Sequence, residues 1–152
     1  MSQPTEDDAV TVAFVCVQNA GRSQMATAFA ERERVRRGLE DRVHVISGGT
    51  EPADRVHDVV VEVMSEIGIS LEDERPEAIT HDETTDADIV VTMGCSAENV
   101  CPMTWRGDAR DWALEDPHGR SLEVVREIRD GIEENVSELF DELTETLTER
   151  SE

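Results

Sequence analysis

The sequence contains no lysine. Its 14 basic residues are all arginine and are outnumbered by 36 acidic residues, so the formal net charge is −22 at pH 7. A field of this sign repels nucleic acids and anionic membranes, because both are bound through basic patches. The acidic residues are spread along the whole chain, and high net charge on a surface is a device that halophiles use. We therefore expect a protein of a salt-rich cytoplasm that has no nucleic-acid or membrane partner.

Long apolar runs are also absent, and cysteines are few. No segment approaches the roughly 18 apolar residues of a membrane span, and residues 1–8 lack the apolar core of a signal peptide. We expect a cytoplasmic chain in which residues 1–9 form a flexible N-terminal segment. Three cysteines in such a chain indicate catalysis or redox chemistry rather than a disulfide framework. They lack the close second Cys or His pair of a zinc site, so we expect no metal and no cofactor.

Length and periodicity predict one α/β domain over residues 1–152. Short β-branched runs predict strands at residues 10–17, 43–47 and 88–93, with a further short strand near 112–114. Apolar residues at spacings of three and four predict helices at 24–37 and 56–67, and a long helix after residue 121. Residues 71–85 are expected to form a loop or a short helical piece. The alternation predicts a three-layer αβα fold with a mostly parallel four-stranded sheet.

Local signals define several boundaries. Ser23 is the expected N-cap of helix 24–37, and the glycines at 48 and 49 are expected to close the second strand. The long helix carries one apolar stripe, opposite an acidic face, which packs on its own sheet or extends into a dimer contact. A disordered acidic chain is the alternative for the whole sequence, but the apolar strands and this stripe argue against it. The stripe consists of Leu122, Val125, Ile128, Ile132, Val136, Leu139, Leu143 and Leu147.

The most informative segment directly follows the first predicted strand. It places a thiol and a guanidinium on one tight loop between a strand and a helix. Backbone N–H groups of such a loop hold a tetrahedral oxyanion such as phosphate or arsenate, helped by the positive end of the helix dipole. The same surroundings favour the thiolate form of the cysteine. The segment reads Cys16, Val17, Gln18, Asn19, Ala20, Gly21, Arg22 and Ser23.

Several side chains of this loop have expected roles. The forked guanidinium of Arg22 can bind two oxygens of the anion at once. Asn19 is expected to brace the loop, and Gly21 to permit a backbone conformation closed to residues with a Cβ. The Ser23 hydroxyl is close enough in sequence to donate to the Cys16 sulfur. The alternative is a buried, inert Cys16 at a strand end and a surface charge at Arg22.

Two further segments carry candidate chemistry. Asp116, on a loop stiffened by Pro117, is a candidate general acid for a departing oxygen, with Glu115 as its competitor. Cys95 follows the predicted strand 88–93, so its thiol and that of Cys16 are expected at the same edge of the sheet. Cys95 and Cys101 would lie ~9 Å apart along a helix axis, beyond the reach of a disulfide. The pair is therefore a candidate moving redox element.

Several motifs occur in the order found in a known family. They are Val-Cys16-Val-Gln-Asn-Ala-Gly-Arg22-Ser23-Gln-Met-Ala, Ser-Gly-Gly-Thr at 47–50, Asp-Glu-Arg-Pro at 73–76, Val-Thr-Met-Gly-Cys95 with Cys101-Pro, and residues 112–117. Through these motifs the chain resembles the arsenate reductases built on the low-molecular-weight protein tyrosine phosphatase fold. The resemblance covers most of the chain, from about residue 12 to the start of the last helix.

The resemblance implies a relay of thiols. In it, Cys16 attacks arsenate held by the loop and Arg22, and Asp116 protonates the leaving hydroxyl. Cys95 then attacks Cys16, which releases arsenite and leaves a disulfide. Cys101 attacks Cys95, and thioredoxin or a similar dithiol protein reduces the final disulfide. Related enzymes finish the cycle with a low-molecular-weight thiol instead.

The chain departs from the family pattern at two positions. Many relatives carry a second cysteine where this chain has Gly21, so no disulfide can close within this loop. The spacing between Cys95 and Cys101 is also tight compared with the best-known thioredoxin-coupled pattern.

Two other functions are compatible with part of the sequence. A phosphatase acting on phosphomonoesters needs only Cys16, Arg22 and Asp116, but the chain lacks tyrosine for an aromatic wall and has two further cysteines to explain. An anion-binding or redox-sensing module is the third alternative.

Overall fold

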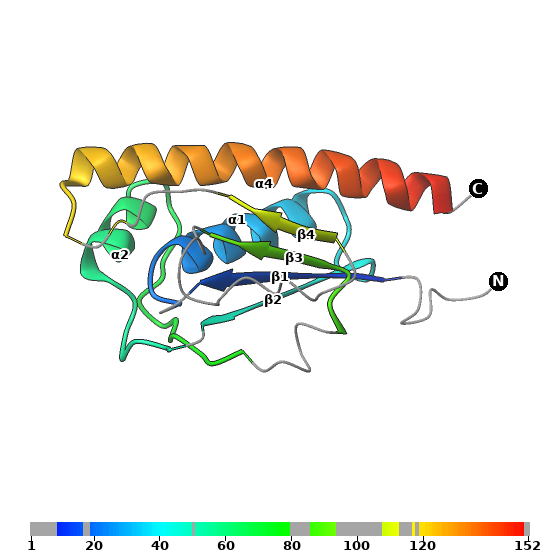
Figure 1. Cartoon of the computed structure of the whole chain (residues 1–152). Helices are drawn as coiled ribbons and strands as arrows, with labels where there is room; N and C mark the ends of the chain where they lie inside the picture. Colours follow the sequence, from blue (N-terminus) through cyan, green and yellow to red (C-terminus); the bar gives the residue numbers. More distant parts are fainter. Residues whose placement is uncertain are drawn as a thin grey trace.

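A computed structural model describes residues 9–16, 19–49, 51–79, 86–93, 108–112, 117 and 119–150. Its centre is a four-stranded parallel sheet in the order β2-β1-β3-β4 (Figure 1). The strands are β1 Val10–Cys16, β2 Val43–Gly49, β3 Ile89–Thr92 and β4 Asp108–Asp111. The almost continuous apolar run of β1 is typical of a parallel strand buried on both faces. The predicted α/β fold with a parallel four-stranded sheet is confirmed.

Helices connect and cover the strands. They are α1 Arg22–Arg36, α2 Asp58–Ser65 and α4 Leu122–Arg150, the last of which extends along the molecule over α1 and α2 (Figure 1). Helix α1 ends where Gly38 adopts a positive φ of 66°, as glycine does after many helices. The predicted helices therefore exist, with ends shifted by a few residues.

Two boundary predictions are wrong. Helix α1 begins one residue before Ser23, and its N-cap position is Gly21 with no side-chain cap. The Ser23 hydroxyl is used elsewhere, as described below. Strand β2 continues through Gly48 and Gly49, because both residues pair with β1.

The position of the fourth strand also differs from the prediction. The prediction near 112–114 lies just after the observed β4, and Trp112 instead donates its backbone N–H to Thr92 O at 2.8 Å. The structure does not describe residues 113 and 114.

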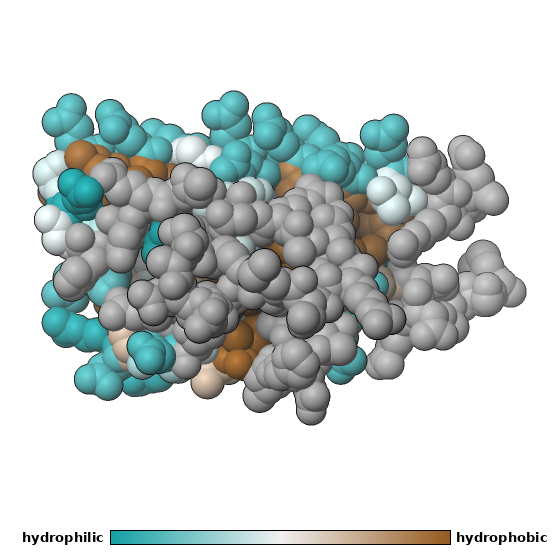
Figure 2. All heavy atoms as spheres, viewed as in Figure 1, coloured by the Kyte–Doolittle hydropathy of each residue, from teal (hydrophilic) through white to brown (hydrophobic). Residues whose placement is uncertain are grey.

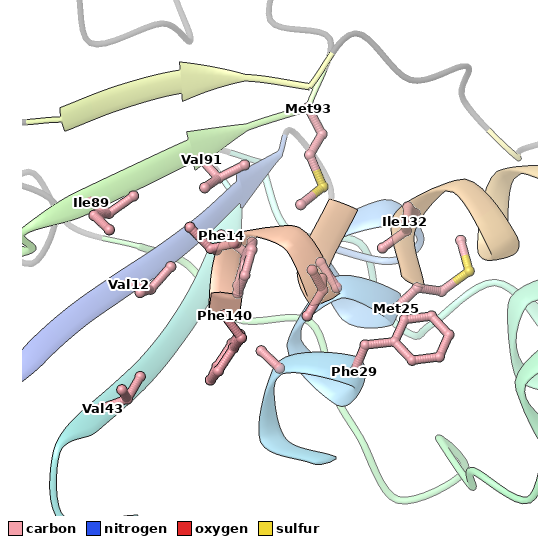
Figure 3. Packing of buried hydrophobic residues seen from close by; sticks show 14 of the residues in the cluster. Val12, Phe14, Met25, Phe29, Val43, Ile89, Val91, Met93, Ile132 and Phe140 are labelled. Carbon is pink, nitrogen blue, oxygen red and sulfur yellow. The ribbon is translucent and has the colours of Figure 1, made fainter. Parts of the chain in front are cut away.

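The main core lies between the sheet and the helices. Phe14 and Val91 of the sheet face Met25 and Phe29 of α1 and Phe140 of α4 (Figure 3). Burying each such side chain contributes about 1.5–3 kcal/mol. The stripe of α4 lies in this same core, buried except for the half-buried Leu122, and α4 packs on α1 and α2 within its own chain. Hydrophilic side chains cover the outer face of α4 at the top of Figure 2. The opposite face of the sheet carries a smaller cluster of Ala13, Val15, Ala87 and Val90.

An ion-pair cluster joins α2 to α4. The Glu66 carboxylate accepts hydrogen bonds from Arg126 Nη2 at 2.6 Å and from Arg129 Nη1 at 3.0 Å. The hydrogen bond from Arg126 holds the pKa of Glu66 below its usual value, and Arg129 acts in the same direction. Arg129 also donates to the carbonyl of Val63 at 2.9 Å. The end of α2 is thereby fixed to the long helix.

No helix in the described ranges combines the length and the apolar composition that crossing a membrane requires.

Candidate active site at the carboxyl end of the sheet

The predicted anion loop begins at the carboxyl end of the central strand. Cys16 is the last residue of β1, and α1 begins at Arg22, so residues 17–21 connect a strand to a helix N-terminus. The Cys16 partner on β2 is Gly49, and β3 ends at Thr92 beside β1. The ends of three parallel strands therefore meet where ligands bind in open α/β sheets. This geometry agrees with the loop expected from the sequence.

The Cys16 sulfur lies among hydrogen-bond donors. Cys16 is 6% exposed, and its thiol is not part of a disulfide. The backbone N–H of Asn19 donates to Cys16 Sγ at 3.1 Å, and Ser23 Oγ lies 2.9 Å from the same sulfur. Donors at these positions stabilise negative charge on the sulfur. The predicted contact between Ser23 and Cys16 is confirmed.

Asn19 determines the direction of these hydrogen bonds. The backbone N–H of Glu77 can only donate, and it lies 2.9 Å from Asn19 Oδ1, which must therefore be the acceptor. The other atom of the amide, Nδ2, donates to Ser23 Oγ at 2.7 Å. The Ser23 hydroxyl hydrogen is then available for the Cys16 sulfur. One amide side chain thus orients the hydroxyl beside the nucleophile.

Asn19 also has an unusual backbone conformation. It has a φ of +51°, and it is the only residue other than glycine with a positive φ among those that the structure describes. Asparagine adopts this left-handed region more readily than most residues. Asn19 is 1% exposed. The predicted role of Asn19 as a brace of the loop is confirmed, and its contact with Glu77 adds a partner from a distant segment.

The segment that contains Glu77 was predicted as a loop or a short helical piece. Its described part, residues 71–79, is a loop, in which Ala78 pairs with Gly49 in an isolated parallel bridge. The Gly49 N–H also donates to Glu77 O at 2.8 Å. A Cβ on Gly48 would lie 2.5 Å from Ile79 Cβ, so this close approach requires glycine. Glycine within a strand often marks such an approach of another backbone. The Gly48-Gly49 pair was therefore the available signal for this contact.

Gly21 lies against Pro117. A Cβ built on Gly21 would lie 2.9 Å from Pro117 Cγ and 3.5 Å from His57 Cδ2. The His57 backbone N–H also donates to Ala20 O at 2.9 Å. Pro117 is buried. The missing side chain of Gly21 therefore allows the proline to pack directly on the anion loop.

The remaining predicted site residues divide into two groups. Arg22 is half-buried at the first position of α1, directly after the loop. Val17, Gln18, Cys95, Cys101, Glu115 and Asp116 lie outside the described residues, so their roles stay predictions. No cluster of three or more His, Cys, Asp or Glu side chains suited to a metal occurs in the described part of the chain.

Comparison with known proteins agrees with this geometry. The model of the low molecular weight phosphotyrosine protein phosphatase family matches residues 11–149. The chain is 57% identical over 136 residues to a putative arsenate reductase of Halobacterium salinarum. The matched residues make up 90% of this chain and 94% of the relative.

Two solved structures are also similar. An arsenate reductase in the phosphate binding state has a TM-score of 0.73 and 34% identity, covering 88% of this chain and 98% of that chain. The thioredoxin-dependent arsenate reductase of Corynebacterium glutamicum has a TM-score of 0.74 and 33% identity, covering 93% of this chain and 65% of that one. With its cysteine loop at the end of a central parallel strand and a family match over most of its length, the chain belongs to the low molecular weight phosphotyrosine protein phosphatase family.

Proposed function

We propose that this protein reduces arsenate to arsenite. The observation that carries the proposal is the Cys16 sulfur, which accepts the N–H of Asn19 and lies 2.9 Å from Ser23 Oγ at the N-terminus of α1. A thiolate there can attack a tetrahedral oxyanion held by the loop N–H groups and Arg22. The relatives that are named arsenate reductases support this substrate.

The first step forms a bond between the Cys16 sulfur and arsenic. One oxygen of arsenate leaves as water after Asp116 donates a proton to it, so arsenic stays pentavalent in the adduct. The buried Pro117 next to Asp116 supports a position of this acid near the loop. A positioned general acid contributes typically ~10²–10⁴ in rate.

The second step transfers two electrons to arsenic. The Cys95 thiolate attacks the Cys16 sulfur, the sulfur–arsenic bond breaks, and its electron pair leaves with arsenic as arsenite. A disulfide between Cys16 and Cys95 remains. Adjacent parallel strands β1 and β3 support this pairing, because β3 ends at Thr92, shortly before Cys95.

The last step regenerates the nucleophile. Cys101 attacks Cys95, which frees Cys16 as a thiolate and moves the disulfide to Cys95 and Cys101. We expect thioredoxin to reduce this disulfide, in line with the thioredoxin-dependent relative, and a low-molecular-weight thiol is the alternative donor. The cycle requires reduced thiols, which is consistent with a cytoplasmic location.

The direct test is a turnover assay in molar salt with arsenate, thioredoxin, thioredoxin reductase and NADPH. We expect arsenite to form with matching NADPH consumption, and almost none to form when thioredoxin and small thiols are omitted. Fast hydrolysis of an aryl phosphate without arsenite formation would establish the phosphatase instead. A lack of turnover with every reductant would leave an anion-binding module.

The substitution Gly21→Ala should lower arsenate turnover by about 10²-fold. The added Cβ would lie 2.9 Å from Pro117 Cγ, and the rigid proline ring cannot rotate away. Pro117 and the neighbouring Asp116 would shift, and a misplacement of about 1 Å costs a rate factor of this order. The measurements are kcat and the affinity for inorganic phosphate, and we expect phosphate affinity to change little because the loop N–H groups and Arg22 remain.

Gly131→Ala in α4 is the matched control, because a Cβ there meets nothing within 4 Å. It should leave kcat unchanged and stabilise the helix by about 0.5–1 kcal/mol. Unchanged turnover in Gly21→Ala, or equal losses of turnover and phosphate affinity, would contradict the proposed role of Gly21.

A further inference from the structure

Gln24 is a buried polar residue to which no role has yet been assigned. It lies in the first turn of α1 and is 5% exposed. Its Nε2 lies 3.0 Å from Asn19 O and 3.1 Å from Asn19 Oδ1, whereas Arg75 O is at 3.5 Å. An amide nitrogen carries two hydrogens, and both nearer acceptors belong to Asn19. The side chain of Gln24 is therefore committed mainly to Asn19.

Holding the Asn19 carbonyl fixes the orientation of a peptide plane. The described peptide bonds include no cis bond, and in a trans peptide the carbonyl of Asn19 and the N–H of Ala20 point in opposite directions. Gln24 anchors the carbonyl on the side of α1. The N–H that follows is thereby turned to the opposite side of the loop.

The preceding peptide plane is held as well. The N–H of Asn19 donates to Cys16 Sγ at 3.1 Å, while the Asn19 backbone keeps its positive φ of 51°. A left-handed conformation is unfavourable for a residue with a Cβ, so it persists only where surrounding contacts hold it. Gln24 supplies two of those contacts from within the same helix–loop unit.

We propose that Gln24 is a positioning residue of the oxyanion loop. Its amide locks the Asn19 backbone so that consecutive N–H groups face the bound anion and the sulfur. The inference rests on the proposed function in one respect, namely that the loop around Cys16 binds an oxyanion. Gln24 acts through Asn19 and does not itself touch the anion.

The test uses the full chain and inorganic phosphate. Phosphate that occupies the loop should protect Cys16 from iodoacetamide, and mass spectrometry of the Cys16 peptide separates this thiol from the other two. We expect Gln24→Met, which keeps the length of the side chain but removes the donors, to need about tenfold more phosphate for half-protection, because buried acceptors lose their partner. The unfolding temperature is measured on the same samples.

Thr27→Val is the matched control. Thr27 lies one turn further along α1, and its hydroxyl donates to Ser23 O at 2.7 Å. This variant loses one hydrogen bond of the same helix and should keep the phosphate requirement of the wild type. A role of Gln24 in stability alone would lower the unfolding temperature of Gln24→Met and leave its phosphate requirement unchanged.

The failure of this inference differs from the failure of the proposed function. A wild-type protein whose Cys16 gains no protection from phosphate would contradict the anion loop itself. Protection of the wild type together with an equal phosphate requirement in folded Gln24→Met would overturn the role of Gln24. If Gln24→Met does not fold, Gln24→Asn provides the same test, because its amide is one methylene too short to hold the Asn19 carbonyl. We then expect a several-fold rise, and no rise would overturn the inference.

Discussion

Arsenate reduction should fall by a factor on the order of 10⁴–10⁶ when Cys16 is replaced by serine, as expected for loss of an essential nucleophile. A serine hydroxyl is protonated at neutral pH and is a far weaker nucleophile than a thiolate. It also cannot form the disulfide through which arsenic receives its two electrons. Both arsenite release and phosphoester hydrolysis should therefore be lost in Cys16→Ser.

Phosphate binding provides the control for this variant. The loop N–H groups, Arg22 and the hydrogen bonds around Asn19 remain, and serine fills nearly the same space at the end of β1. Cys16→Ser should bind inorganic phosphate with an affinity close to that of the wild type, which titration calorimetry can measure. Substantial arsenite production by this variant would exclude Cys16 as the nucleophile.

Cys95→Ser should separate the two chemistries that the loop allows. Without the Cys95 thiol, the step in which Cys95 attacks the Cys16 sulfur and releases arsenite cannot occur. Arsenate turnover should therefore fall to background. Hydrolysis of an aryl phosphate needs only Cys16, Arg22 and Asp116, and its rate should stay close to that of the wild type. The measurement is the ratio of arsenite formation to phosphoester hydrolysis, with and without thioredoxin.

Cys101→Ser is the companion variant for the end of the relay. It should lose turnover driven by thioredoxin while still releasing arsenite once per molecule, because the disulfide between Cys16 and Cys95 can still form. Normal arsenate turnover in Cys95→Ser would contradict the relay at its central step. Equal loss of phosphatase activity in Cys95→Ser would show that the substitution damages the anion loop rather than the electron transfer.

The strands and helices could largely be predicted because their signals are local. The β-branched run of β1 and the stripe of α4 each bury one continuous apolar surface, which the sequence displays directly. Strand β4, Asp108–Asp111, carries charged residues that disfavour a strand, and it forms at the sheet edge because β3 offers a pairing partner. Partner-dependent elements of this kind are not visible in a local pattern.

The site could be predicted in its chemistry but only partly in its support. The Cys16 loop, the brace at Asn19 and the contact with Ser23 follow from residues close in sequence. Ser23 is not the N-cap because α1 already begins at Arg22, and its hydroxyl hydrogen-bonds with Asn19 and Cys16. Glu77 lies 58 residues from Asn19, and its contribution is a backbone N–H, which any residue except proline could supply.

The pairing of Ala78 with Gly49 has a consequence for control of the nucleophile. The same short segment places the Glu77 N–H on Asn19, so a backbone contact at the sheet edge determines how the Ser23 hydroxyl is oriented. If this segment separated from β2, Asn19 Oδ1 would lose the Glu77 N–H and keep only the longer hydrogen bond from Gln24 Nε2 at 3.1 Å among its described donors. Local opening far from the loop in sequence would thus weaken the support of the hydroxyl beside the nucleophile.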